Sequence, residues 1–167
     1  MFHALTEFIP VWQYEAEMTQ KTLDNITDGA LAYSGYADGR TIGRLAWHIV
    51  QTVPEMMAKA GLAVAGPSEH EPVPATAQTI CDAYREASTS LIEQLNAQWT
   101  DATLREVDEM YGERWSRAQT LAILLAHQTH HRGQLTVLMR QAGLPLSGIY
   151  GPTREEWANW GMPAPVI

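Results

Sequence analysis

The sequence predicts an all-α protein, a four-helix bundle with long connections and a short C-terminal helix. Apolar residues recur at helical spacing in four long segments, and breaks rich in Gly, Pro and Asp separate them. The chain has 167 residues, of which 46% are hydrophobic, and this is enough for one domain with its own core. We therefore treat residues 1–167 as a single bundle domain, in which each long helix buries one apolar face against the others.

The first two helices are expected in the N-terminal third. The first covers about residues 11–26, and Thr-Asp-Gly at 27–29 ends it. The second covers residues 41–61, and Thr41 is placed to cap its first turn. Pro54 lies inside this second helix and is expected to kink or interrupt it, because proline has no amide hydrogen for the helical ladder.

The third helix is expected from Thr76 to about Trp99, after a loop rich in Pro and Gly. Its candidate core positions recur on one face: Ile80, Tyr84, Leu91 and Leu95. Helical periodicity then weakens over residues 100–115, where Gly112 indicates a turn. We interpret this segment as a structured loop, with a short hairpin as the alternative.

The fourth helix is expected to begin at Ser116, which forms a capping box with Gln119. Gly143, followed closely by a proline, closes it. A second capping box starts a short helix that carries two tryptophans: Thr153 with Glu156, then Trp157 and Trp160. The connections over residues 27–40 and 100–115 are long enough to permit an order other than up-down-up-down.

Charge and cysteine content restrict the partners and the compartment. The formal net charge is -8 and the pI is about 5.1, which argues against a nucleic-acid partner. A single cysteine, Cys81, excludes an internal disulfide framework and fits a reducing compartment. We find neither a signal peptide nor a run of 18 apolar residues, so we expect a soluble cytoplasmic protein without a membrane partner.

Three histidines lie within five residues of each other in the fourth helix. Residues four apart share a helix face, so His127 and His131 can direct their imidazoles at one metal ion. At about 100° per residue His130 lies roughly 100° away from His131, on the shoulder of the apolar face. The alternative is that the pair consists of interior histidines bonded to the backbone or to each other.

A catalytic divalent site usually takes three protein ligands and keeps one open position. Of the other histidines, only His48 lies in an apolar helical context, so it is the best third donor for His127 and His131. A di-iron carboxylate bundle is excluded because no Glu-x-x-His motif occurs. The zinc-protease signature is excluded because Gln128 stands where that motif needs a glutamate.

Three segments resemble the DinB/YfiT-like family: Leu-Ala-Trp-His-Ile at 45–49, the histidine-rich run at 127–134, and Gly-Ile-Tyr-Gly-Pro at 148–152. The resemblance extends over essentially the whole chain. It implies a four-helix bundle in which one histidine of the second helix and two of the fourth hold a divalent ion. By motif position these are His48, His127 and His131.

The resemblance also implies zinc or nickel as the ion, and a homodimer. Iron or manganese are further options for a site of this kind. Some members of the family are thiol-dependent transferases or isomerases that use bacillithiol, mycothiol or glutathione. The chemistry of such a site agrees with this, because an ion on three neutral imidazoles lowers the pKa of a bound water to about 7 or holds a thiol as thiolate. The first supports hydrolysis and the second supports thiol transfer to a small-molecule substrate.

No cysteine of the chain is placed to act as nucleophile, since Cys81 is expected to pack as a small apolar residue. A reacting thiol would therefore come from a low-molecular-weight cosubstrate. The rival hypotheses are a non-catalytic stress-response or metal-binding protein, which uses the bundle to bind a ligand or to dimerise, and a metal sensor or buffer.

Several further side chains are candidates for positions beside the metal or in its pocket: His130, Gln134, Glu55, Tyr111 and Trp115. Gln134 is expected to orient water or substrate, or else to make an interhelical hydrogen bond. Glu55 is expected to be a solvated carboxylate or a salt-bridge partner, with proton acceptance as the alternative. The two aromatic residues are expected to pack, with the lining of a pocket mouth as the alternative. We assign no general base.

Two neighbours of the histidines carry structural expectations. Arg132 should form a salt bridge. Gly133 costs a helix interior roughly 1 kcal/mol, which suggests that another helix approaches it closely.

Overall fold

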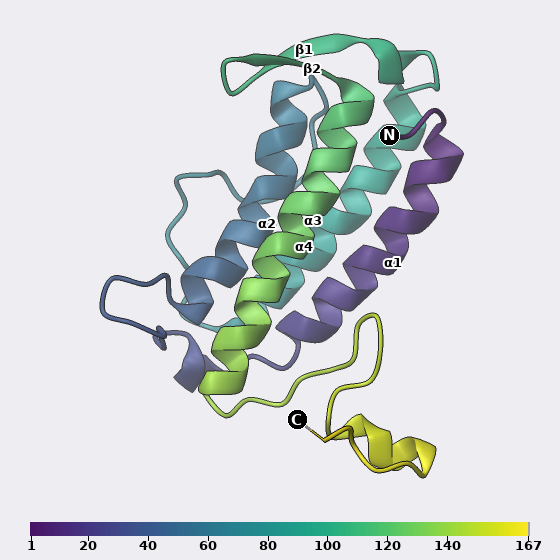
Figure 1. Cartoon of the computed structure of the whole chain (residues 1–167). Coiled ribbons are helices and arrows are strands. Elements are labelled where there is room, and N and C mark those ends of the chain that lie inside the picture. Colours follow the sequence, from purple (N-terminus) through teal and green to yellow (C-terminus); the bar gives the residue numbers. More distant parts are fainter. Residues whose placement is uncertain (167) are drawn as a thin grey trace.

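A computed structural model describes residues 1–166 as four α-helices with a two-stranded antiparallel sheet across one end (Figure 1). The α-helices are α1 (Leu5–Leu23), α2 (Ile42–Lys59), α3 (Ala77–Gln98) and α4 (Arg117–Gln141). The strands are β1 (Val107–Met110) and β2 (Glu113–Ser116), and short 3₁₀ helices are η1 (Asp28–Ala30), η2 (Thr103–Arg105) and η3 (Glu156–Trp160). The predicted bundle is confirmed, but the all-α class left out the sheet.

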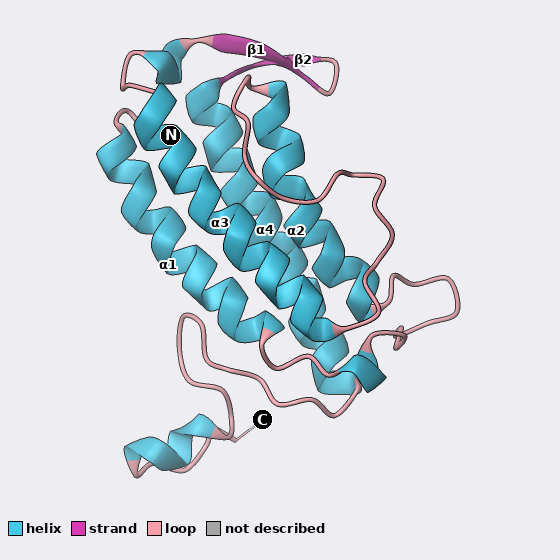
Figure 2. Cartoon of the chain, turned by 180° about the vertical axis from the view of Figure 1, so that it is seen from behind, coloured by secondary structure: helices cyan, strands magenta, loops and turns pink. Residues whose placement is uncertain are grey.

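The helices do not alternate in direction. Helices α1 and α4 run one way and α2 and α3 the other, with α2 packed against both α3 and α4 (Figures 1 and 2). Because α2 and α3 are parallel neighbours, residues 60–76 between them return along the length of the bundle. The order is therefore other than up-down-up-down, as the sequence allowed. The connections over residues 27–40 and 100–115, from which this was inferred, each join antiparallel helices instead.

Side-chain caps begin three of the helices, two of them as predicted and the third at Thr76. Each cap oxygen accepts a hydrogen bond from the backbone amide three residues later: Thr41 from Arg44, Thr76 from Thr79 and Ser116 from Gln119. Gly143 has φ +76°, the left-handed conformation that ends α4. The four core positions proposed for α3 are all buried. Most helix boundaries could thus be derived from local chemistry.

Two of the helices continue through a proline. Helix α1 begins at Leu5 rather than near residue 11 and continues through Pro10, because Phe8 and Trp12 are fully buried and hold the first turns in place. The Leu5 amide also donates to Asp101 Oδ1 at 2.8 Å. Helix α2 likewise continues through Pro54, so the predicted interruption is wrong. Packing of an apolar face outweighs one missing backbone hydrogen bond.

The segment between α3 and α4 contains the hairpin that was the alternative interpretation. Met110 pairs with Glu113, which leaves a two-residue loop of Tyr111 and Gly112. Their φ angles are +56° and +84°, as a type I′ turn requires. A tyrosine in the left-handed region is uncommon, and here the turn places Tyr111 beside the C-terminal half of α2.

The predicted salt bridge of Arg132 is confirmed, and it lies in the interior. Arg132 is 1% exposed, and its Nη2 lies 2.7 Å from Glu15 Oε2 on α1. Nη1 donates to Thr19 Oγ1 at 3.0 Å. The Tyr150 hydroxyl accepts from Arg132 Nη2 at 2.6 Å and donates to Glu15 Oε1 at 2.7 Å. One network therefore links α1, α4 and the C-terminal segment.

The expectation that another helix approaches Gly133 is wrong. Gly133 is exposed, and a Cβ built on it meets no atom of residues 1–166 within 4 Å. Packing within residues 1–166 therefore does not require a glycine at this position, although glycine lowers the stability of the helix.

We predict that Gly133→Ala raises the free energy of unfolding by about 1 kcal/mol, because alanine restricts the unfolded chain and favours the helix. Urea unfolding followed by circular dichroism measures the change. Gly43→Ala is the matched control, since its Cβ would lie 3.0 Å from the Leu31 carbonyl oxygen and should lower stability. A destabilised Gly133→Ala protein would show that this face is covered in solution.

Candidate metal centre

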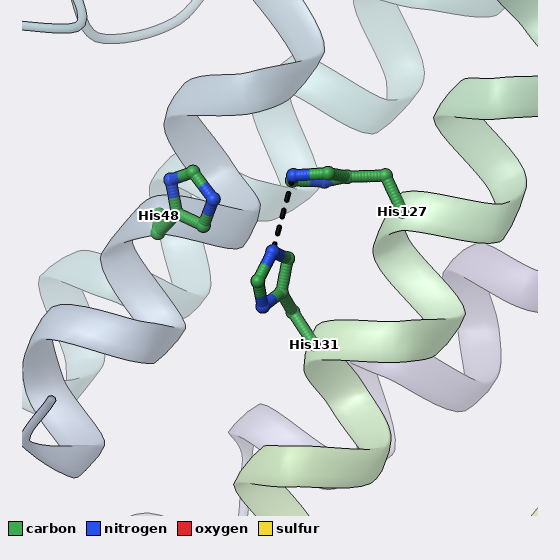
Figure 3. Close-up of side chains that lie close together, drawn as sticks. All are labelled: His48, His127 and His131. Atoms are coloured by element: carbon green, nitrogen blue, oxygen red, sulfur yellow. Dashed lines mark hydrogen bonds between the residues drawn. The ribbon is translucent and has the colours of Figure 1, made fainter. Parts of the chain in front are cut away.

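The fold brings His48, His127 and His131 together. Helices α2 and α4 are neighbours, and the three side chains point into the space between them (Figure 3). One ring nitrogen from each histidine can be chosen such that all three lie within 4.8 Å of one another. The clustering predicted from helical spacing and from the apolar context of His48 is therefore present.

The spacing of the nitrogens suits a common ion. His127 Nε2 and His131 Nε2 lie 3.1 Å apart, a hydrogen bond between the two rings that the alternative interpretation expected (Figure 3). Two nitrogens bound tetrahedrally to one ion at about 2.0–2.1 Å lie roughly 3.3 Å from each other. The His48 ring centroid lies 5.0 Å from that of His127 and 4.6 Å from that of His131. Three imidazoles in this arrangement could hold one metal ion.

Gln134 orients one of the three rings. Its side-chain oxygen Oε1 lies 2.8 Å from His131 Nδ1. Because an amide oxygen only accepts, Nδ1 must carry the hydrogen, and in the neutral ring Nε2 then keeps a lone pair, which accepts from His127 Nε2. Gln134 is thus beside the site as predicted, although its bond is within α4 rather than between helices. His127 Nδ1 is buried and has no partner among residues 1–166.

All three imidazoles are neutral at pH 7. Burial lowers the pKa of His48 from 6.5 to about 4, and the nearby charges of His131, His127, Arg40 and Arg44 act in the same direction. Burial lowers the pKa of His127 to about 4 as well. Burial also lowers the pKa of His131, against the opposing effect of the Gln134 hydrogen bond. Neutral rings are the form that binds a metal.

A cavity of about 410 Å³ opens beside His48 and His127. Glu55, Tyr111 and Trp115 line it, as the sequence suggested. The Tyr111 hydroxyl donates to Glu55 Oε2 at 2.6 Å, so the hairpin loop is joined to α2 across the cavity. Burial, followed by this bond, raises the pKa of Tyr111 well above its ordinary value. Lys59 Nζ lies 3.4 Å from Glu55 Oε1, which confirms the expectation of a salt bridge.

A second cavity, of about 530 Å³, opens beside His131. Arg40 and Gln134 lie on its wall together with apolar side chains. Sequence reasoning missed Arg40, although its position directly before the Thr41 cap and eight residues before His48 was visible. It also missed Arg44, which lines the first cavity and donates to Gln51 Oε1 at 2.8 Å.

His130 lies outside the cluster of the other three histidines. It is exposed, and its ring centroid lies 4.9 Å from that of His131. The position on the helix shoulder agrees with its predicted angle, and the residue is a neighbour of the site.

Comparison with known proteins gives consistent results. Residues 1–162 match the model of the DinB family. YrdA of Bacillus subtilis (strain 168), an uncharacterized protein, is 44% identical over 165 residues, which are 99% of each chain. The crystal structure of a DinB-like protein from Bacillus cereus ATCC 10987 superposes with a TM-score of 0.86 at 42% identity, covering 90% of this chain and 100% of that one.

A second solved structure, the DinB-like protein YjoA of Bacillus subtilis, has a TM-score of 0.66 at 18% identity and covers 87% of this chain and 99% of that one. At this identity the similarity concerns the fold alone.

We predict that the metal-free protein loses stability as the pH falls from about 6.5 through about 4, in part because of His48 and His127. Their pKa values are lowered in the folded state, so the unfolded chain binds more protons across this window, and protonation favours unfolding. Free energies of unfolding from urea titrations at pH 7, 6, 5 and 4 measure the effect. Carboxyl groups titrate in the same range, so the comparison is with a His48→Asn/His127→Asn double variant. Equal pH slopes for the two proteins would contradict the prediction.

Proposed function

The chain belongs to the DinB family, and from this premise we propose that it is a metal-dependent enzyme that acts on a small molecule. The reaction is hydrolysis or thiol-dependent S-transfer. His48, His127 and His131 hold one divalent ion, zinc or nickel first, with iron or manganese as alternatives. The observation that carries the proposal is that the histidine cluster borders a cavity that also contains a carboxylate.

When bound, a divalent ion on three neutral imidazoles supplies positive charge that makes a water or thiol at the open position more acidic. The protein's own residues prepare the site for it. Gln134 holds the His131 ring so that Nε2 faces the other two histidines. The burial that keeps the rings neutral removes competition from protons.

Of the two carboxylates in this cavity, Glu55 is the one that we propose as proton acceptor. Tyr111 and Lys59 each contact one of its oxygens, and these two contacts fix the direction of the carboxylate. The Glu55 carboxylate and the imidazoles of His48 and His127 belong to the same cavity wall. A substrate in this cavity would thus have both the metal ligands and the proposed proton acceptor on its walls, the proximity that general base catalysis requires.

The reacting thiol of a transferase would be a cosubstrate. Cys81 lies on α3 and is buried, and burial raises the pKa of its thiol to about 11. Such a thiol is a poor nucleophile at neutral pH. The partners we propose are therefore a small-molecule substrate and, for S-transfer, a low-molecular-weight thiol.

We place the protein in the cytoplasm as a homodimer, without nucleic-acid or membrane partners. The single cysteine supports a reducing compartment. The net charge of -8 argues against a DNA partner. Within residues 1–166 no helix is both long and apolar enough to cross a membrane. The homodimer follows from the family resemblance.

We predict that tag-free protein contains about one divalent ion per chain, since three imidazoles form one complete set of ligands. His48→Ala, His127→Ala and His131→Ala should each lose the ion, while the exposed neighbour His130→Ala keeps it. Elemental analysis by mass spectrometry, with circular dichroism to confirm folding, measures both. A metal-free parent protein that does not take up added zinc or nickel would contradict the site.

Assays of the loaded protein separate the enzyme from its rivals. Ester hydrolysis and thiol conjugation to an electrophile are measured for the parent and for Glu55→Gln. Turnover that falls at least about tenfold in Glu55→Gln, with the metal retained, supports the enzyme. A bound metal without turnover of any tested substrate favours the non-catalytic metal-binding protein.

A further inference from the structure

We propose that the cavity on the His131 side binds the anionic group of a small-molecule substrate, and that Arg40 is the residue that recognises it. The inference rests on the proposed function in one respect: it takes the three histidines as the reacting centre. It adds a substrate class, namely a small anion with a short apolar part.

The lining of this cavity has one charged group. Arg40 alone carries a formal charge among the described residues on its wall. The polar groups beside it are Tyr36 and Gln134, and His131 connects the cavity to the candidate metal centre. A molecule held by Arg40 can therefore reach the histidine cluster from this side.

The guanidinium of Arg40 is available to a ligand. It makes no ion pair and donates no side-chain hydrogen bond to any of residues 1–166, whereas Arg44, four residues later, donates to Gln51. A guanidinium offers five N–H donors in a planar fork that matches carboxylate, sulfonate and phosphate groups. Arg40 is thus a free anion receptor on the wall of a cavity.

The backbone at the start of α2 does not compete for the same anion. The Ile42 amide donates to the Tyr33 carbonyl at 2.9 Å, and the Gly43 amide donates to the Leu31 carbonyl at 2.9 Å. The next amide donates to the Thr41 cap. These amides already have partners, so recognition falls to the Arg40 side chain rather than to the helix N-terminus.

Charge decides which of the two cavities receives the anion. The cavity beside His48 and His127 contains two carboxylates, Glu55 and Glu69, against one arginine. The cavity beside His131 contains a cation and no carboxylate. An anionic substrate is repelled by the first and attracted by the second, so its reacting end points toward the histidines while a second reactant or water enters from the Glu55 side.

The remaining wall is apolar. Leu45, Val137 and Leu138 line the cavity with Arg40, and Val137 is 57% exposed. Such a wall contributes by burying hydrocarbon rather than by hydrogen bonding. The ligand that fits is an anionic head with a short apolar chain.

The test is an NMR titration of the full chain with hexane-1-sulfonate, with hexan-1-ol as the uncharged probe of equal length. It is run with one equivalent of zinc and again after zinc is removed by EDTA. We expect saturable amide shifts around the cavity, at Tyr36, Leu45, Val137 and Leu138, and weaker binding of the alcohol. Arg40→Gln should weaken sulfonate binding about fivefold, the size of a partly solvated charge contact, and Arg40→Lys should retain part of the affinity.

Arg85→Gln is the matched control. It removes the same charge from an exposed position on α3, so the affinity should stay unchanged. Equal binding of sulfonate and alcohol, shifts confined to other surfaces, or an unchanged affinity in Arg40→Gln would each overturn the anion site. The titration without zinc tests the anion site whether or not zinc binds. Failure of zinc to bind contradicts the proposed metal-dependent function and leaves the anion site to be judged by that titration.

Discussion

A buried guanidinium fixes the orientation of α4, and the candidate site depends on that orientation. Arg132 is 1% exposed, so leaving its charge without partners would cost several kcal/mol. Glu15 and Thr19 on α1 supply those partners, and Tyr150 closes the network from the C-terminal segment. Because His131 precedes Arg132 by one residue, it lies about 100° around the helix. Turning Arg132 toward α1 therefore turns His131 toward α2.

The two faces of α4 carry different kinds of polar group. On one face the charge of Arg132 is neutralised inside the bundle by Glu15. On the other, burial keeps the imidazoles neutral, and His127 Nε2 lies 3.1 Å from His131 Nε2, at hydrogen-bond distance. The first arrangement holds helices together without an ion. The histidine face supplies ring nitrogens that a cation could bind. One cavity borders His48 and His127, and a second cavity borders His131.

Features that depend on local chemistry could be predicted from the sequence. The caps of α2, α3 and α4 need only a hydroxyl at the right place. The histidine pair of α4 follows from a spacing of four residues, and His48 follows from its apolar surroundings.

Features that depend on distant contacts could not be predicted in this way. The early start of α1 rests on Asp101, 96 residues away. The prediction that another helix approaches Gly133 was wrong because one sequence does not show which side of a helix stays exposed. Arg40 was missed because an arginine in a loop has no pattern until the fold places it in a cavity.

The most direct test of the three-histidine centre is X-ray absorption at the metal K-edge of the loaded protein, which reports ligand type, number and distance. A site made by His48, His127 and His131 predicts a spectrum fitted by about three imidazole nitrogens at roughly 2.0–2.1 Å together with light oxygen donors. Sulfur from Cys81, or a shell of water oxygens with no imidazole scattering, would contradict it.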